Sequence, residues 1–239
     1  MRVTIIIPAL NEAGNITRLI GEIPHDIVAS VQVIVVDNGS TDDTAKIAAV
    51  AGAQVVSEPR RGYGQACAAG VAAIGTANVM DHGSDVVVFL DGDGSFDPAE
   101  ISRLIAPITE NRADMVLGSR ALGGMEPGAM PPHQQFGNRL VSRLMGLLYG
   151  LRLTDLGPFR AVRWEILAKI DMREMTFGWP TEMIVKAANL KTRIIEVPVS
   201  YRCRWTGKSK VSGTLRGTLL ATYFILGVTL RYAFNRRTR

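Results

Sequence analysis

Cysteine is scarce in this sequence, since Cys67 and Cys203 are the only two among 239 residues. Two cysteines so far apart build neither a disulfide framework nor a zinc site, and this usage suits a reducing compartment. The apolar run at the N-terminus is too short for a signal peptide, because polar residues follow from Asn11. We therefore expect a cytoplasmic protein, and an apolar content of 47% is enough for a large core.

Two further absences narrow the function. No G-x-G-x-x-G follows the first apolar run, so the dinucleotide-binding fingerprint is missing. Aromatic residues make up 6% of the chain and are not interleaved with a basic stripe, so we expect no nucleic-acid partner. The net charge of +5 favours other anions, such as nucleotide phosphates or an acidic membrane surface.

Uncharged runs long enough to cross a membrane are also missing. The run from 217 to 230, between Arg216 and Arg231, spans about 21 Å as a helix, short of the ~30 Å hydrocarbon core. We predict that 213–239 form an amphipathic helix with a basic tail, peripheral on the cytoplasmic face of an anionic membrane or packed as a core helix. A second amphipathic stretch, 136–153, is expected to line a lipid-chain groove or to pack in the core.

Apolar runs alternate with segments of helical periodicity along most of the chain. The runs at 3–8, 31–37, 53–58, 85–91 and 114–119 predict strands, and 14–23, 40–51, 64–75 and 97–108 predict helices. Alternation of this kind is typical of an α/β fold with a mostly parallel sheet and helices on both faces. Ligands in such folds bind beyond the carboxyl ends of the strands.

Acidic side chains stand at those strand ends. Asp91 and Asp93 follow the fourth run, separated by a glycine. Two carboxylates held together repel, and a divalent cation such as Mg²⁺ or Mn²⁺ removes that cost, usually with phosphates as further ligands. The alternative is a turn with helix-capping acids, and this is the role expected for Asp97. Asp37, at the end of the second run, is expected to accept from a base N–H or a ribose hydroxyl, or else to cap the next helix.

Several motifs carry a family resemblance. The segments IIIPALNE (5–12), VVDNGSTDDT (35–44), GYGQA (62–66), FLDGDGSFDP (89–98) and GSR (118–120), in this order, resemble the family-2 glycosyltransferases of the GT-A fold, which is Rossmann-like. DLGPFRAVR (155–163), FGWPTEM (177–183), IIEVPVSYRCR (194–204) and GKSK (207–210) resemble the branch that makes dolichyl- and polyprenyl-phosphate sugars. The resemblance covers 1–212, which we take as the glycosyltransferase domain, followed by the helix and tail of 213–239.

The resemblance implies an inverting, metal-dependent transfer of a hexose from UDP-glucose or GDP-mannose to a polyprenyl phosphate. Asp91 and Asp93 would hold the metal, and Asp93, Arg120 and Arg204 would be catalytic. The residues implied at the nucleotide sugar are Pro8, Ala9, Asn11, Glu12, Asp37, Asp91, Gly92 and Glu182. Those implied at the acceptor phosphate are Arg120, Arg204 and Lys210. Mannose-transferring members tend to carry Ser/Thr-Ser-Gly-Phe-Arg after the aspartate at 155, where this chain has Leu156-Gly157-Pro158, so the sugar stays open.

The chemistry fits these residue types. A cation and cationic side chains stabilise the leaving diphosphate as charge develops. A lipid phosphate is already an anion, so it needs orientation more than a general base. His133 is a candidate general base. The alternative is that its side chain is hydrogen-bonded to the backbone of its loop and has no catalytic role.

Two other functions remain open at this point. One is the same enzyme class with a different acceptor, such as a diacylglycerol, a glycan or a small metabolite. The other is a catalytically silent nucleotide-binding protein. The Arg and Lys residues of 202–212 favour an anionic acceptor, and the intact Asp91-Gly92-Asp93 favours an active enzyme. A homo-oligomer is compatible with the sequence.

Overall fold

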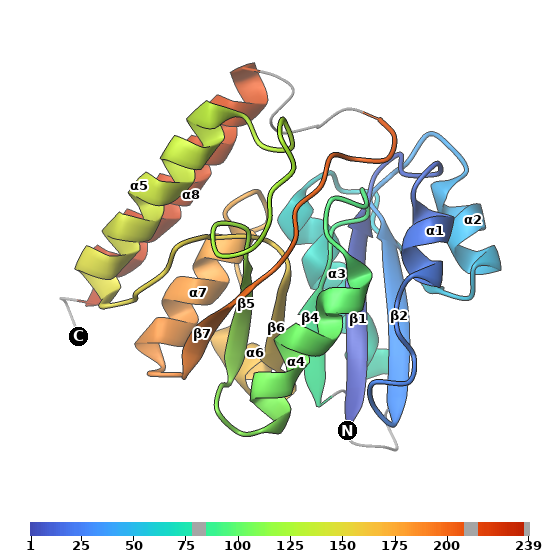
Figure 1. Cartoon of the computed structure of the whole chain (residues 1–239), viewed down its shortest axis with the longest axis horizontal. Helices are drawn as coiled ribbons and strands as arrows, with labels where there is room; N and C mark the ends of the chain where they lie inside the picture. The colour runs from blue at the N-terminus through green and yellow to red at the C-terminus, as the bar shows by residue number, and fades with distance from the viewer. Residues whose placement is uncertain (78–84, 208–214, 237–239) are drawn as a thin grey trace.

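A seven-stranded sheet forms the centre of the protein (Figure 1). The computed structural model describes residues 1–77, 85–207 and 215–236. The strands lie in the order β3-β2-β1-β4-β6-β5-β7. Their bounds are β1 (Arg2–Ala9), β2 (Ser30–Asp37), β3 (Gln54–Ser57), β4 (Val86–Phe89), β5 (Met115–Ser119), β6 (Arg160–Arg163) and β7 (Ile194–Pro198).

Six of these strands are parallel, and β6 runs antiparallel between β4 and β5. The predicted mostly parallel α/β fold is confirmed, and all five predicted strands are present. The sequence did not predict β6, because arginines occupy both ends of this four-residue strand and leave no apolar run. It also did not predict β7.

Helices cover both faces of the sheet. The helices α1 (Ile16–Gly21), α2 (Thr44–Val50) and α4 (Ile101–Thr109) pack on one face, and α3 (Tyr63–Ala77), α6 (Trp164–Ile170) and α7 (Trp179–Asn189) pack on the other. Side chains alternate between the faces with a period of two, so Ile5 and Ile7 meet the first layer and Ile6 the second. Asp97 caps the short 3₁₀ helix Pro98–Glu100 by accepting from the Ala99 amide, as predicted.

Two long helices stand beside the sheet. In Figure 1, α5 (Pro132–Tyr149) and α8 (Leu215–Arg236) run side by side and rest on α7. The buried side of α8 includes Val228, and the Tyr149 hydroxyl donates to the Thr229 carbonyl at 2.6 Å. One face of α8 is therefore packed, while Tyr223 and Phe234 on the same helix are exposed. Among the described residues, no helix has the length and apolar character needed to cross a membrane.

The carboxyl ends of β1, β2, β4 and β5 meet at one edge of the sheet. The chain leaving β7 returns across this edge towards α1 (Figure 1). It is held there by backbone bonds such as Arg202 N–H to the Ser95 carbonyl, 2.9 Å. This edge holds most of the residues selected from the sequence.

Candidate active site

The acidic turn after β4 is the centre of the site. Asp93 is buried, and its Oδ1 accepts from the Ser95 amide at 2.9 Å. Its Oδ2 lies 2.7 Å from Nη2 of Arg204, which comes from the segment after β7. Asp91 is half-buried and accepts from the Tyr63 hydroxyl at 3.2 Å. Burial, together with the charge of Asp93, raises the pKa of Asp91 to about 7.

These donors suit a hard divalent cation. No three His, Cys, Asp or Glu side chains within the described parts of the chain converge to form a complete protein cage. Mg²⁺ needs no such cage, because it commonly binds through one or two carboxylates and takes its other ligands from water and phosphates. The paired carboxylates of Asp91 and Asp93 therefore fit a metal that arrives with a phosphorylated ligand.

A pocket of about 470 Å³ opens beside this turn. Seven of the residues selected from the sequence line it: Pro8, Ala9, Glu12, Asp91, Gly92, Asp93 and Arg204. Three aromatic side chains that were not predicted from the sequence line it as well: Tyr63, Phe177 and Phe224. The GYG motif marked the segment that contains Tyr63, but gave no sign that its ring enters the site. We call this space the donor pocket.

Asn11 and Asp37 lie next to the donor pocket without lining it. The Asn11 side chain accepts from the Thr41 amide at 2.7 Å, and Asp37 Oδ1 accepts from the Ser40 amide at 3.0 Å. Both therefore fix the loops that follow β1 and β2. Contact of Asp37 with a base or ribose stays a prediction.

The structure does not bring Glu182 to the donor pocket. Its buried carboxylate accepts from the Tyr232 hydroxyl of α8 and from the backbone amides of Arg173 and Glu174, and it pairs with Lys186 at 3.0 Å. The motif places Glu182 on a helix near the site but does not define which way its side chain points. Lys210 lies outside the described residues.

A second pocket, of about 330 Å³, adjoins the first. The two share Tyr63, Asp91 and Phe177 among their lining residues. From Asp91 this pocket runs between α5 and α8, whose apolar side chains form its walls: Leu140, Val141, Ile225 and Leu226. His133, near the start of α5, also lines it. We call this space the apolar cleft.

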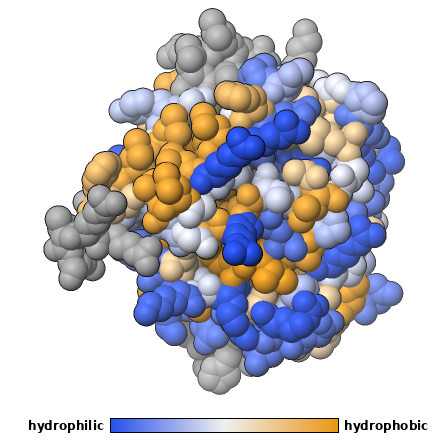
Figure 2. All heavy atoms as spheres, turned by 60° about the vertical axis from the view of Figure 1, so that its left-hand side comes forward, coloured by the Kyte–Doolittle hydropathy of each residue, from blue (hydrophilic) through white to orange (hydrophobic). Residues whose placement is uncertain are grey.

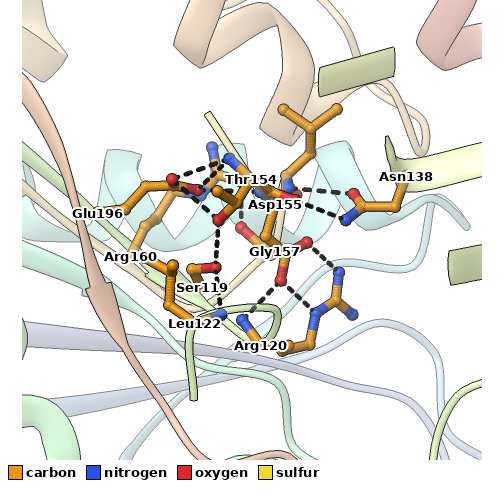
Figure 3. A network of polar contacts seen from close by, with 10 residues as sticks. Ser119, Arg120, Leu122, Asn138, Thr154, Asp155, Gly157, Arg160 and Glu196 are labelled. Atoms are coloured by element: carbon orange, nitrogen blue, oxygen red, sulfur yellow. Dashed lines mark hydrogen bonds and ion pairs between the residues drawn. The ribbon is translucent and has the colours of Figure 1, made fainter. Parts of the chain in front are cut away.

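Arg120 borders the apolar cleft in a fixed orientation (Figure 3). Its Nε and Nη2 donate to the two oxygens of Asp155, each at 2.7 Å, and its backbone amide donates to Oδ2 at 2.8 Å. Although burial opposes ionisation, these bonds hold the pKa of Asp155 below its ordinary value and raise that of Arg120. The Asp155 backbone amide donates to Glu196, which completes the support. Such a locked guanidinium suits recognition of a phosphate.

Arg160 is buried beneath the same loop. Its guanidinium donates to the carbonyl oxygens of Gly157 at 2.5 Å and Pro180 at 2.7 Å, and burial lowers its pKa to about 10. Leu156, Pro158 and Pro180 all line the apolar cleft. Arg160 therefore joins two segments of the cleft wall, a role the sequence motif did not reveal.

A sequence model of glycosyl transferase family 2 matches residues 4–171, more than half of the chain. The chain belongs to glycosyl transferase family 2. It is thus a glycosyltransferase that depends on a nucleotide sugar. The fold-family expectation drawn from its motifs is confirmed.

Relatives of known sequence extend over nearly the whole chain. An uncharacterized glycosyltransferase of Mycobacterium tuberculosis is 39% identical over 220 residues, which cover 92% of this chain and 94% of the relative. The undecaprenyl-phosphate mannosyltransferase of Micrococcus luteus is 31% identical, covering 97% and 96%. The polyprenol monophosphomannose synthase of Mycolicibacterium smegmatis is 30% identical, covering 89% and 82%.

A solved structure shares the fold. Glucosyl-3-phosphoglycerate synthase of Mycobacterium tuberculosis, in complex with Mn²⁺, UDP and phosphoglyceric acid, superposes with a TM-score of 0.75 at 24% identity. The match covers 97% of this chain and 78% of that one. At this identity the likeness supports the GT-A architecture alone.

Proposed function

We propose that this enzyme transfers a hexose from a UDP- or GDP-linked donor to a polyprenyl phosphate, with inversion and with Mg²⁺ or Mn²⁺. The observation that carries the choice of acceptor is the junction of the two pockets. At Asp91 the donor pocket, which contains the charged side chains of Glu12, Asp93 and Arg204, opens into the apolar cleft between α5 and α8, and Arg120 lies at the border of the cleft. An acceptor with an anionic head and an apolar tail matches this arrangement.

The named relatives support the same acceptor. One is named an undecaprenyl-phosphate mannosyltransferase, and another is named a polyprenol monophosphomannose synthase. The structural neighbour binds phosphoglyceric acid, so a small anionic acceptor is the second candidate. A small acid would leave the apolar walls of the cleft, such as Val141 and Ile225, without a partner.

The residues of the site have distinct proposed tasks. Asp91 and Asp93 would hold the divalent ion, which would neutralise charge on the departing diphosphate. Mn²⁺ or Mg²⁺ accompanies UDP in the structural neighbours. Arg204 lines the donor pocket and would bind the donor's phosphates. Arg120, locked by Asp155, would orient the acceptor phosphate beside the donor sugar, and no general base is required.

Filling the apolar cleft tests this assignment. Ala221→Phe places a ring among the lining residues on α8. We expect transfer to a polyprenyl phosphate to fall about tenfold or more, because the ring would displace part of the lipid tail. A loss of about 1.4 kcal/mol in binding free energy lowers the affinity tenfold. Binding of the nucleotide sugar should stay unchanged, because Ala221 does not line the donor pocket.

The control is Ala49→Phe, the same change at an exposed position of α2. It should leave both measurements unaltered. Full transfer by the Ala221→Phe protein would contradict the cleft as the tail site. The measurements are acceptor KM and donor affinity by calorimetry.

We further propose that the α5–α8 face lies on an anionic membrane surface. Exposed apolar side chains recur on one side of each helix: Phe136, Leu140 and Leu147 on α5, and Leu220, Tyr223, Leu230 and Phe234 on α8. Figure 2, with these helices turned towards the viewer, shows the apolar area they form. We call it the apolar patch.

The charges around the patch favour anionic lipid. The exposed arginines Arg139, Arg143 and Arg231 lie on the same two helices, and neither helix contains Asp or Glu. Apolar side chains surrounded by basic residues are typical of surfaces that bind anionic bilayers. In this proposal 1–212 supply the chemistry, while 213–239 supply one wall of the cleft and half of the patch.

Removing three aromatic side chains of the patch should release the protein from membranes. Each one contributes on the order of 1.5 kcal/mol on entering a bilayer, so Phe136→Ser/Tyr223→Ser/Phe234→Ser should lower binding to phosphatidylglycerol-containing vesicles more than tenfold. The fold should persist, since all three are exposed. Co-sedimentation measures the effect.

The matched control is Val50→Ser/Leu190→Ser, which changes exposed apolar residues away from the patch. It should bind vesicles like the wild type. Equal binding by the triple variant, or no preference of the wild type for anionic over neutral vesicles, would overturn the membrane proposal.

A further inference from the structure

Arg204 pairs with Asp93, the carboxylate that we propose as a metal ligand. Its Nη2 lies 2.7 Å from Oδ2 of Asp93, and its Nη1 lies 3.8 Å from Oε1 of Glu12. The other oxygen of Asp93 already accepts from the Ser95 amide. Both oxygens of this carboxylate are therefore engaged by the protein itself. A divalent ion that binds Asp93 through Oδ2 would compete with the guanidinium for this oxygen, because two cations so close together repel each other.

The segment that carries Arg204 is attached to the core on both sides of it. Before Arg204, the Arg202 guanidinium donates to the Gly94 carbonyl at 2.8 Å and to Glu22 at 3.0 Å. After it, the Thr206 hydroxyl donates to Asn15 Oδ1 at 2.8 Å. These attachments do not involve Asp93, so the Arg204 side chain can leave the carboxylate while its backbone stays in place.

Trp205 reports directly on this arrangement. Two guanidinium groups contact its ring, that of Arg18 at 4.2 Å and that of Arg202 at 4.5 Å from the ring centroid. It also covers Gly94, which has φ +72° and where a Cβ would lie 2.4 Å from the ring. The indole therefore rests on the turn that carries the metal-binding carboxylates, next in sequence to Arg204.

The charges in the donor pocket indicate that the displaced guanidinium would bind the donor's diphosphate. Glu12, Asp91 and Asp93 all line the donor pocket, and Arg204 lines it with them. When a divalent ion neutralises the negative charge of Asp93 in place of Arg204, the donor's diphosphate binds with the ion and adds negative charge to the pocket. A guanidinium released a few ångströms away forms charge-assisted hydrogen bonds with such oxygens.

We propose that Arg204 is an exchangeable counter-ion: it pairs with Asp93 while the metal is absent and transfers to the diphosphate when metal and donor bind. This inference rests on the proposed function, because it needs a metal-bound nucleotide in the donor pocket. It gives Arg204 two opposite effects. The side chain weakens binding of the metal alone and strengthens binding of the metal with a nucleotide.

The test uses binding and needs no turnover. Binding of Mn²⁺ is measured by the loss of the free-ion electron paramagnetic resonance signal, for wild type and Arg204→Met, first alone and then with UDP or GDP. Arg204→Met should bind Mn²⁺ alone about fivefold more tightly, since a partly exposed ion pair contributes about 1 kcal/mol. With the nucleotide that binds the wild type, Arg204→Met should bind that nucleotide at least tenfold more weakly.

The control is Arg18→Met, which removes a cation that contacts the Trp205 ring but does not pair with Asp93. It should leave both affinities at the wild-type values. In addition, Mg²⁺ with nucleotide should change the tryptophan emission of the wild type, and Trp205→Phe should remove that change.

Three outcomes would overturn the inference. Weaker binding of Mn²⁺ alone by Arg204→Met would mean that Arg204 organises Asp93 and does not compete with the metal. Unchanged nucleotide affinity would mean that the released side chain does not reach the diphosphate. If the wild type binds neither Mn²⁺ nor a nucleotide, the proposed function fails together with this inference. If the wild type binds both, but Arg204→Met does not change the two affinities in the stated directions, only the inference fails.

Discussion

Asp93→Asn abolishes sugar transfer while the protein stays folded: this is the largest effect we expect from a single substitution. Loss of one metal ligand removes several kcal/mol of charge stabilisation at the leaving diphosphate, or about a thousandfold in rate. The fold should persist, because asparagine keeps an oxygen for the Ser95 amide. Initial rates with Mg²⁺ and Mn²⁺, together with thermal unfolding, measure the two parts of the prediction.

Asp97→Asn is the matched control, four residues along the same turn. Asp97 caps the 3₁₀ helix and lines neither described pocket, so transfer should be retained. Turnover of Asp93→Asn near the wild-type rate with either ion would show that Asp93 is not a metal ligand.

Arg120→Met should cost both stability and transfer. It leaves the carboxylate of Asp155, which is 1% exposed, without its charged partner, and breaking a buried pair in this way costs about 3–5 kcal/mol. It also removes the cation that we place at the acceptor phosphate. Chemical denaturation gives the stability change, and the acceptor KM and kcat give the functional one.

A second substitution separates these two losses. Arg120→Met/Asp155→Asn removes both charges of this pair and keeps an oxygen for the residue 120 backbone amide. It should recover about half or more of the lost stability but none of the transfer. Recovery of transfer would mean that Arg120 acts only through the fold. As a control, Arg173→Met breaks an exposed pair with Asp171 and should leave stability close to that of the wild type.

The strands and the acidic turn could be predicted from the sequence because each depends on a short contiguous segment. Continuous apolar runs marked five of the six parallel strands, and the acids after the fourth run marked the turn at Asp91 and Asp93. Because parallel strands end at one edge, residues as distant as Pro8 and Asp91 could be assigned to one pocket. Arg204, more than a hundred residues further on, was assigned by family resemblance.

The remainder depends on contacts between distant segments. Arg120 lies in the loop after β5, and Asp155 lies in the loop before β6. The pairing of β5 with β6 brings these loops together, and β6 contains no apolar run from which it could be predicted. The direction of Glu182 depends on α8, whose Tyr232 holds its carboxylate. An amphipathic period showed that α5 and α8 each have an apolar side, but not that part of each would face the other and enclose a cleft.

A transfer assay tests the central claim most directly. The protein, with Mg²⁺ or Mn²⁺, is incubated with UDP-glucose or GDP-mannose, and with a short polyprenyl phosphate or 3-phosphoglycerate as acceptor. Products are identified by mass. We predict a hexosyl polyprenyl phosphate with one of the two donors and no sugar on 3-phosphoglycerate. Glucosylated phosphoglycerate without any lipid-linked sugar would contradict the account.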